Sequence, residues 1–347
     1  MSGMNRTLAR SLPKVLLHEH LDGGLREATL WQLLHERGLQ APAPDPQGLA
    51  VWLDQRALAG SLEAYLEGFG LTVAAMASEQ GLRRVAFEAA QDALDDGCVL
   101  AEFRIAPLLF GDWGLSPDVV VAALLEGLAQ CPLPTGLIVC AMRHQPDTVP
   151  VAVDLALRWQ GRGVVGFDLA GPEAGWPARR YAPDLARVSE AGLGLTLHAG
   201  EADGPHRVLE AASLGAQRIG HGVRLADWLR DSQHQEDLAF LRQRGTHLEV
   251  CPTSNVHTGV VPSVAAHPIA ALWRFGLSLS FHTDNRLISR VSASSEAWTL
   301  VEQTPLGWGD LQAMGLAAAR ASFLPEPVRS RAEEMLRCWA PPAEPAG

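Results

Sequence analysis

The sequence predicts an α/β fold, a (β/α)₈ TIM-type barrel with extra helices inserted between its first and second strands. Eight short runs of β-branched and apolar residues occur along the chain, and stretches of helical period separate them. Polar side chains gather at the carboxyl ends of these runs, where such barrels carry their active sites. The chain has 347 residues, 47% of them hydrophobic, which is enough for one large barrel domain.

The predicted strands are short, and most of them end near a histidine, an aspartate or a glycine. They span residues 14–20, 98–107, 135–144, 163–171, 192–200, 216–222, 246–255 and 277–285. Strict alternation in the fifth strand puts Gly194, Thr196 and His198 on one side and leucines on the other. The small inward residues leave room for a ligand inside the barrel.

Helices are predicted between these strands, and several of them end at a glycine, as helices commonly do. The clearest examples span residues 79–97, 117–130, 182–192 and 267–276. Segment 26–97 holds more helix than one barrel unit requires, around the Pro-rich APAPDPQG at 41–48. We expect this segment to form an insertion near the barrel mouth, where it could act as a lid. A single barrel domain over 1–347, with a disordered tail from about 339, completes the prediction.

Composition limits the partners and the location of the chain. A formal net charge of -11 and the lack of a Lys/Arg run argue against a nucleic-acid partner, and a small molecule is favoured. No apolar run reaches the ~18 residues of a membrane span, and the N-terminus does not resemble a signal peptide. Five widely spaced cysteines without a CxxC pair fit a reducing compartment, so we expect a cytoplasmic protein.

A metal site is the strongest functional signal in the sequence. The first strand ends in HEHLDGG, in which His18 and His20 point to the same side because side chains alternate along a strand. His198 and Asp284 occur at the ends of the fifth and eighth strands. A lone histidine is more often a hydrogen-bonded core residue than a ligand, but four such donors at equivalent strand ends favour a metal. Nitrogen and oxygen donors suit zinc with an open position for water.

Two further residues near this set have competing interpretations. Glu201 follows His198 in HAGE and is either a proton shuttle beside the metal or a carboxylate that stabilises a helix N-terminus. His221 in RIGHG either binds a second metal or acts on the attacking water. The fourth strand offers no lysine that could be modified to bridge two metals, so one metal is favoured.

Other polar residues on the strands receive structural interpretations. Glu102 and Arg104 share one face of the second strand, and a buried ion pair inside the barrel is favoured over a catalytic role. Asp168, Arg143, His144 and His282 are expected to support the site or the fold.

Six motifs, taken in their order along the chain, resemble those of the adenosine deaminase family of metal-dependent hydrolases. They are LHEHLDG (17–23), DLAGPE (168–173), HAGE (198–201), RIGHG (218–222), CPTSN (251–255) and HTDN (282–285). This resemblance extends over about residues 12–330 and implies a (β/α)₈ barrel with one Zn²⁺ per chain. It implies that His18, His20, His198 and Asp284 are the zinc ligands, and that Glu201 protonates purine N1. His221 is then the histidine that orients the attacking water and helps to deprotonate it.

The resemblance also implies how a purine nucleoside is held. His20 would border the substrate, Asp22 would hold the ribose 5′-hydroxyl, and the backbone of Gly171 would face purine N3. Many members of the family carry an aspartate facing purine N7, whereas this chain has Asn285.

The expected reaction is the hydrolytic deamination of adenosine, and of 2′-deoxyadenosine, to the inosine product and ammonia. A sister activity on adenine, or on a modified adenine nucleoside such as aminofutalosine, remains an alternative. A catalytically inactive nucleoside-binding relative is disfavoured because all four ligands and Glu201 are present. The sequence does not specify an oligomeric state.

Overall fold

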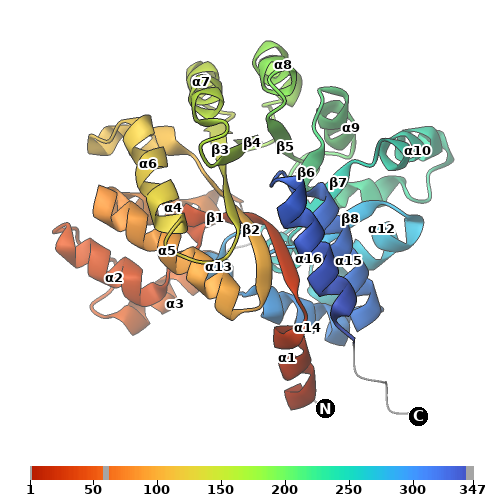
Figure 1. The fold of residues 1–347 in the computed structure, drawn as a ribbon, viewed down its shortest axis with the longest axis horizontal. Helices are drawn as coiled ribbons and strands as arrows, with labels where there is room; N and C mark the ends of the chain where they lie inside the picture. The colour runs from red at the N-terminus through yellow and green to blue at the C-terminus, as the bar shows by residue number, and fades with distance from the viewer. Residues whose placement is uncertain (1, 58–61, 341–347) are drawn as a thin grey trace.

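The computed structural model describes residues 2–57 and 62–340 and confirms the predicted barrel. Eight strands, each parallel to the next, follow one another around the sheet in sequence order, with helices around them (Figure 1). The strands are β1 (Lys14–His20), β2 (Cys98–Ile105), β3 (Thr135–Met142), β4 (Val164–Ala170), β5 (Gly194–Ala199), β6 (Arg218–His221), β7 (His247–Val250) and β8 (Ser278–Phe281).

The sheet closes through the segment that follows β8. The backbone N–H of His20 donates to the carbonyl oxygen of Asp284 at 2.8 Å, and the N–H of Asp284 donates to the carbonyl oxygen of His18 at 3.0 Å. Glu19 and Asp284 form a parallel bridge between the same two segments. The backbone hydrogen bonds that close the ring are therefore made by predicted metal ligands or their neighbours.

The helices lie outside the strands, as the amphipathic patterns require. They are α1 (Ser2–Ser11), α2 (Glu27–Glu36), α3 (Pro46–Ala57), α4 (Leu62–Met76), α5 (Glu79–Asp95), α6 (Pro117–Leu128), α7 (Val149–Trp159), α8 (Ala182–Glu190), α9 (His206–Ser213), α10 (Gln235–Arg244), α11 (Pro252–His257), α12 (Ile269–Phe275), α13 (Arg286–Ser289), α14 (Ala293–Gln303), α15 (Trp308–Ala321) and α16 (Glu326–Cys338).

The described residues of segment 26–97 form four helices with two different roles. Ser78 precedes helix α5, and its side chain accepts a hydrogen bond from Gly81 N; the helix packs against β2 and α6 as an ordinary barrel helix. Helices α2, α3 and α4 pack on one another. Helix α4 also contacts the short turns at 21–23 and 107–113, which follow β1 and β2. The extra helices are thus the first three, and α4 lies at the carboxyl end of the barrel.

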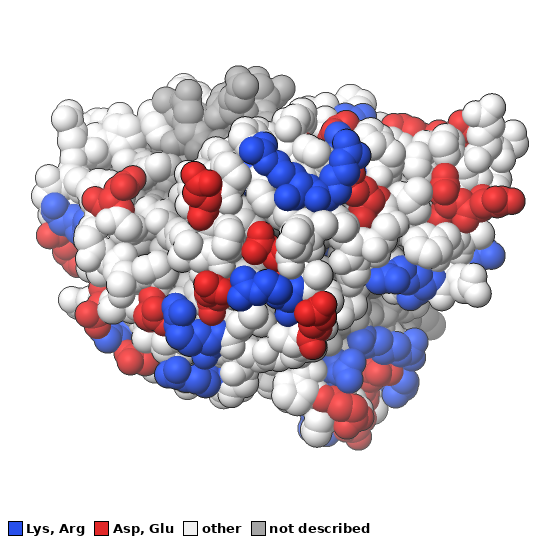
Figure 2. Space-filling model, turned by 90° about the horizontal axis from the view of Figure 1, so that it is seen from above, with Lys and Arg blue, Asp and Glu red and all other residues white. Residues whose placement is uncertain are grey.

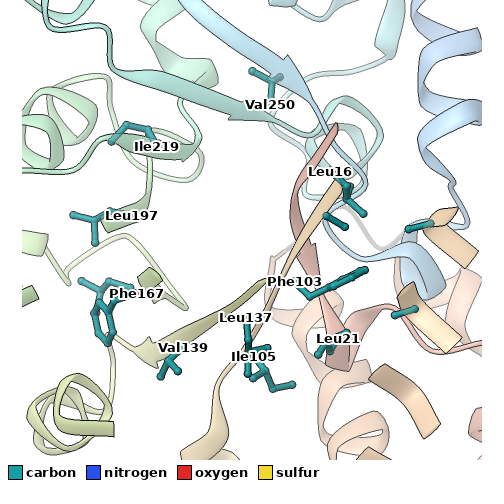
Figure 3. Packing of buried hydrophobic residues seen from close by; sticks show 14 of the residues in the cluster. Leu16, Leu21, Phe103, Ile105, Leu137, Val139, Phe167, Leu197, Ile219 and Val250 are labelled. Carbon is teal, nitrogen blue, oxygen red and sulfur yellow. The ribbon is translucent and has the colours of Figure 1, made fainter. Parts of the chain in front are cut away.

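The hydrophobic core lies between the strands and the helices. Along each strand, apolar side chains that point into this core alternate with side chains that point into the barrel. Buried apolar side chains on five strands are Phe103, Phe167, Leu197, Ile219 and Val250 (Figure 3). The adjacent residues on these strands are polar and face the barrel interior: Arg104, Asp168, His198, Arg218 and Glu249. Period-2 alternation therefore packs the outside of the sheet and sets charged groups inside it.

Two predicted strands end well before their predicted limits, whereas the others end within two residues of theirs. Segment 246–255 is extended only to Val250, because Pro252 begins helix α11 and CPTSN turns with it. Segment 277–285 is extended only to Phe281, since Asp284 adopts a positive φ of 58°. Asn255 accordingly lies within helix α11, and Asn285 directly precedes helix α13, so neither is in a strand.

The last described residues pack against the body of the protein, and the surface shows mixed charges. Trp339 packs against Trp308, and its Nε1 donates to Ser11 Oγ at 3.2 Å, whereas most of the tail that we expected to be disordered lies outside the described residues. Basic and acidic side chains are interspersed on the face shown in Figure 2. None of the described helices is by itself long and apolar enough to cross a membrane. One bent pair of helices, 107–113 with 117–128, is long and apolar enough when the two are taken together, by length and composition only.

Candidate active site and metal centre

The four predicted metal ligands meet at the carboxyl end of the barrel. We call them the ligand layer: His18, His20, His198 and Asp284. The Nε2 atoms of His20 and His198 lie 3.3 Å apart. Asp284 Oδ1 lies 3.3 Å from His18 Nε2 and 3.6 Å from His20 Nε2. Strands β1 and β5 and the segment after β8 thus bring all four together.

Local backbone strain accompanies this convergence. Asp284 and His221 have φ values of 58° and 67°, a left-handed conformation that is uncommon for residues other than glycine. The hydrogen bonds to β1 hold the Asp284 backbone, and Ser254 Oγ donates to Asp284 Oδ2 at 2.5 Å. Such strain persists only where the surroundings fix the residue, and it is typical of functional sites.

Two carboxylates set the tautomers of the ligand histidines. His18 Nδ1 lies 2.8 Å from Glu249 Oε2, and His198 Nδ1 lies 2.9 Å from Asp168 Oδ2. A carboxylate can only accept, so each Nδ1 carries the proton and each Nε2 is left as a bare acceptor. His18 Nε2 is buried and has no hydrogen-bond partner among the described residues. Carboxylate–histidine pairs with a free Nε2 are the usual arrangement of metal-bound histidines.

The electrostatics of the ligand layer favour the metal-binding protonation states. Burial, reinforced by the neighbouring histidines, holds the pKa of His20 well below its ordinary value and thus favours the neutral imidazole. Burial acts to raise the pKa of Asp284, but the surrounding histidines, His18 foremost, outweigh it and hold that pKa well below its ordinary value. Neutral imidazoles around an ionised carboxylate form a suitable donor set for a divalent cation.

His221 belongs to the same cluster. Ligand atoms of His18, His198, His221 and Asp284 all lie within 4.8 Å of one another, a group that could hold a metal ion. The His221 ring centroid lies 5.1 Å from that of His18 and 5.3 Å from that of His198. Five candidate donors therefore surround this site, one more than the four that the sequence assigned to the metal.

Glu201 points to His221 instead of serving a helix. Its Oε2 lies 3.5 Å from His221 Nε2, while its Oε1 accepts from Thr258 Oγ1 at 3.1 Å and from Asn255 Nδ2 at 3.4 Å. Helix α9 begins five residues later, at His206. The helix-stabilising interpretation of Glu201 is therefore wrong, because the carboxylate lies outside the first turn of any helix.

A cavity of about 490 Å³ opens onto these residues. Its polar wall includes Glu201, His221 and Asp284, and its apolar wall includes Phe69 and Val73 of helix α4. The inserted helices thus contribute to the mouth of the site, and the volume is in the range of small-molecule pockets.

The three remaining predicted binding residues also border this cavity. Asp22 is buried, and burial together with the charge of Asp284 raises its pKa to about 7. Gly171 has a φ of 90°, and a Cβ there would approach His144 Nδ1 to 3.0 Å, so the position requires glycine. Asn285 Oδ1 is buried without a hydrogen-bond partner among the described residues.

A second buried group of charges lies earlier along the strands, and we call it the ion-pair layer: Glu102, Arg104, Asp168, Arg218 and Glu249. Arg104 pairs with Asp168 at 2.9 Å and with Glu249 at 2.6 Å. Arg218 pairs with Glu102 and Glu249, both at 2.6 Å. The predicted Glu102–Arg104 pair is thus wrong, because each residue reaches across the barrel to other strands instead of along its own.

Sequence reasoning missed several residues that support the site. Glu249 was not singled out, although alternation in THLEVC places it on the inward side between His247 and Cys251. Ser254, Thr258 and His267 gave no signal, because their roles depend on how helix α11 and the chain after it fold back over the barrel.

A closed (β/α)₈ barrel with nitrogen and oxygen donors at the carboxyl ends of its strands defines a metal-dependent barrel enzyme. The sequence profile of the adenosine deaminase family matches residues 13–338, and the chain belongs to this family.

Similar proteins include an adenosine deaminase from Mycobacterium tuberculosis, 43% identical over 332 residues, and one from Mycobacterium marinum, 41% identical over 331 residues. Each alignment covers 91% of both chains. Among solved structures, an N6-methyl-AMP deaminase from Arabidopsis is 25% identical, with a TM-score of 0.83 over 95% of this chain and 99% of that one. An adenine deaminase from Arthrobacter aurescens, 22% identical with a TM-score of 0.82 over 94% and 98% of the two chains, has the same fold.

Proposed function

We propose that this chain catalyses the hydrolytic deamination of adenosine, and of 2′-deoxyadenosine, to the inosine product and ammonia. The observation that carries the proposal is the joint presence of the ligand layer, Glu201 and His221 around one cavity. The relatives named adenosine deaminase, at 41–43% identity over 91% of the chain, favour adenosine over other substrates. A cytoplasmic location stays a prediction.

We assign one divalent zinc ion to His18, His20, His198 and Asp284. The bare Nε2 atoms of His18 and His198 and the ionised Asp284 fit the nitrogen and oxygen donors that zinc prefers. Bound there, zinc would lower the pKa of a water molecule toward ~7 and supply hydroxide at neutral pH.

Two side chains would manage protons around the purine ring. Glu201 would donate a proton to ring N1, so that the ring accepts the nucleophile at C6. Its Oε1 already accepts from Asn255 and Thr258, which leaves Oε2 as the oxygen that carries and delivers the proton. His221, whose Nε2 lies 3.5 Å from Glu201 Oε2, would orient the attacking water.

Three residues would position the nucleoside. Asp22 would hold the ribose 5′-hydroxyl with Oδ1, an oxygen that has no hydrogen-bond partner among the described residues. The backbone of Gly171, which borders the cavity and has a φ of 90°, would face purine N3. His20 would border the ring from the metal side.

Asn285 would donate a hydrogen bond to purine N7. N7 is an acceptor, and the Asn amide can donate to it without the shared proton that an aspartate would require. We expect Asn285→Ala to lower kcat/KM for adenosine about tenfold to a hundredfold, the cost of an unpaired buried group. Rates on adenosine and 7-deazaadenosine for both enzymes form a double cycle. An equal penalty for losing N7 in the two enzymes would show that Asn285 does not contact the purine.

A direct test of the substrate is to follow absorbance with adenosine, 2′-deoxyadenosine, adenine and aminofutalosine side by side. We expect kcat/KM to be highest for adenosine and 2′-deoxyadenosine. A preference for adenine or aminofutalosine would replace the proposal with the sister activity. No turnover of any of the four by zinc-loaded protein would contradict the deaminase assignment itself.

A further inference from the structure

A chain of hydrogen bonds runs from helix α12 to His221 behind the proposed active site. The backbone N–H of Ile269 donates to His267 Nδ1 at 3.0 Å, and His267 Nε2 lies 3.2 Å from Asn255 Oδ1. Asn255 Nδ2 in turn lies 3.2 Å from His221 Nδ1 and 3.4 Å from Glu201 Oε1. His221, Asn255 and His267 are all buried, at 1%, 0% and 5% exposure, so water does not substitute for these partners.

The direction of every hydrogen bond in this chain follows from its first member. A backbone N–H can only donate, so His267 Nδ1 accepts and the proton of the neutral ring lies on Nε2. His267 Nε2–H then donates to Asn255 Oδ1. The opposite orientation of the Asn255 amide would set two donors against each other, so this orientation of its oxygen and nitrogen is fixed.

Asn255 therefore presents N–H groups to the catalytic side. One N–H points to His221 Nδ1, which must accept, and the other points to Glu201 Oε1. Neutral His221 must then carry its proton on Nε2, the nitrogen that lies 3.5 Å from Glu201 Oε2, while its ring lies beside His18, His198 and Asp284. Burial lowers the pKa of His267 to about 3, which keeps this ring neutral and able to accept from Ile269.

We propose that His267 and Asn255 are positioning residues that lock His221 in the Nε2–H tautomer. In this tautomer His221 Nε2 donates a hydrogen bond toward the reacting centre and cannot accept a proton from water. His221 would thus orient the nucleophile while Glu201 exchanges protons, which separates two roles that the family resemblance leaves combined in His221. The proposal rests on the proposed deaminase function for its catalytic meaning, but the tautomer is defined independently of activity.

The test reads the tautomer directly. ¹⁵N-histidine labelling of the zinc-loaded protein distinguishes protonated from bare ring nitrogens by their ¹⁵N shifts, and a His221→Asn spectrum identifies the His221 signals among the 12 histidines. We expect His221 to be protonated at Nε2 in the wild type. In Asn255→Asp the carboxylate can only accept, so we expect the His221 proton to move to Nδ1. Wild-type His221 protonated at Nδ1, or an unchanged tautomer in Asn255→Asp, would overturn the proposal.

A pair of variants at His267 separates positioning from packing. Glutamine can accept from Ile269 N and donate to Asn255 Oδ1, whereas leucine can do neither. We expect His267→Gln to keep the Nε2–H tautomer and kcat within about threefold of the wild type. His267→Leu should give mixed His221 tautomers and lower kcat for adenosine about tenfold or more, with little change in KM.

The exposed His206, at 55% side-chain exposure, provides a matched control, because His206→Leu should change neither readout. Equal kcat and equal tautomers in His267→Gln and His267→Leu would contradict the positioning role. The NMR readout still applies if the wild type proves inactive on adenosine, so failure of the proposed function and failure of this inference are distinguishable.

Discussion

The ligand layer and the ion-pair layer are both buried inside the barrel, but their charged groups are partnered differently. In the ion-pair layer, each guanidinium bridges two carboxylates at 2.6–2.9 Å. In the ligand layer, His18 Nε2 has no hydrogen-bond partner among the described residues, and Asp284 has a strained backbone. Arg104 Nε and Arg218 Nη2 also lack a hydrogen-bond partner among the described residues, so the difference lies in the charges. The charges of the ion-pair layer are balanced by one another, which indicates a structural role, whereas the ligand layer leaves the acceptor His18 Nε2 free to bind something else.

Glu249 and Asp168 connect the two layers. Glu249 accepts from Arg104, Arg218 and Thr196 as well as contacting His18, and Asp168 pairs with Arg104 and His198. Burial acts to raise the pKa of Glu249, but the two guanidinium groups outweigh it and keep that pKa well below its ordinary value. The ion-pair layer thus supplies the ionised carboxylates that fix the tautomers of the ligand histidines.

The largest expected effect is the loss of activity when Glu201, beside the ligand layer, is replaced. Glu201→Gln should retain the metal and the fold but lower kcat for adenosine by several orders of magnitude, because the amide cannot deliver a proton to N1. General acid catalysis alone contributes ~10²–10⁴-fold. Steady-state kinetics and elemental analysis on the same preparation measure both properties. A variant that keeps more than about a tenth of wild-type kcat would place Glu201 outside the proton transfer.

A substitution in the ion-pair layer should lower the stability of the fold. Glu249→Gln should lower the free energy of unfolding of metal-free protein by about 3–5 kcal/mol, because two buried guanidinium groups lose a shared counter-charge. Urea unfolding measures this change. Asp118→Asn, which removes an exposed partner of Arg158, is the matched control and should change little. Equal losses in the two variants would remove the distinction between the buried layer and the surface.

The sequence alone predicted many of the residues at the carboxyl end of the barrel, but few of the contacts between them. The strand order could be predicted, and so could the gathering of His18, His20, His198, Asp284, Glu201 and His221 at one end of the barrel. Strand alternation and the carboxyl-end rule place these residues without knowledge of loops. The partners of Arg104 and Glu102 could not, since pairing across the barrel depends on stagger between strands that are distant in the sequence. Thr258 and His267 were also out of reach, and Asn255 could be placed only at the end of the predicted seventh strand, because the start of helix α11 at Pro252 interrupts that strand.

Glu296 provides a pH-dependent test of a buried charge outside both layers. Its Oε1 accepts from Thr253 N at 3.0 Å, its Oε2 has no partner among the described residues, and burial raises its pKa to about 7. The folded state therefore binds this proton more tightly than the unfolded state, so the stability contributed is present below pH ~4.5 and is lost as the pH rises to about 7.

Glu296→Gln should remove this dependence. Relative to the wild type, the variant should gain roughly 2–3 kcal/mol in free energy of unfolding between pH 5 and pH 8. Parallel urea titrations at the two pH values measure the difference. A stability difference between variant and wild type that does not change with pH would show that Glu296 titrates normally.

His198→Ala should affect the metal-free fold less than Glu249→Gln does, but it should have a large effect on metal content. Three remaining ligands should not retain zinc against a chelator, while the free energy of unfolding of metal-free protein should fall by less than in Glu249→Gln, since Asp168 keeps Arg104 as a partner. Elemental analysis after dialysis against chelator, together with urea unfolding, measures both. Unchanged metal content would remove His198 from the ligand set.

The central claim is that one zinc ion, held by the ligand layer, makes this chain an adenosine deaminase. The most direct measurement is to titrate metal-free protein with zinc while following both bound metal and the loss of adenosine absorbance. We predict that activity rises linearly and saturates at one zinc per chain. Saturation at two metals per chain, or full adenosine turnover by metal-free protein, would contradict the claim.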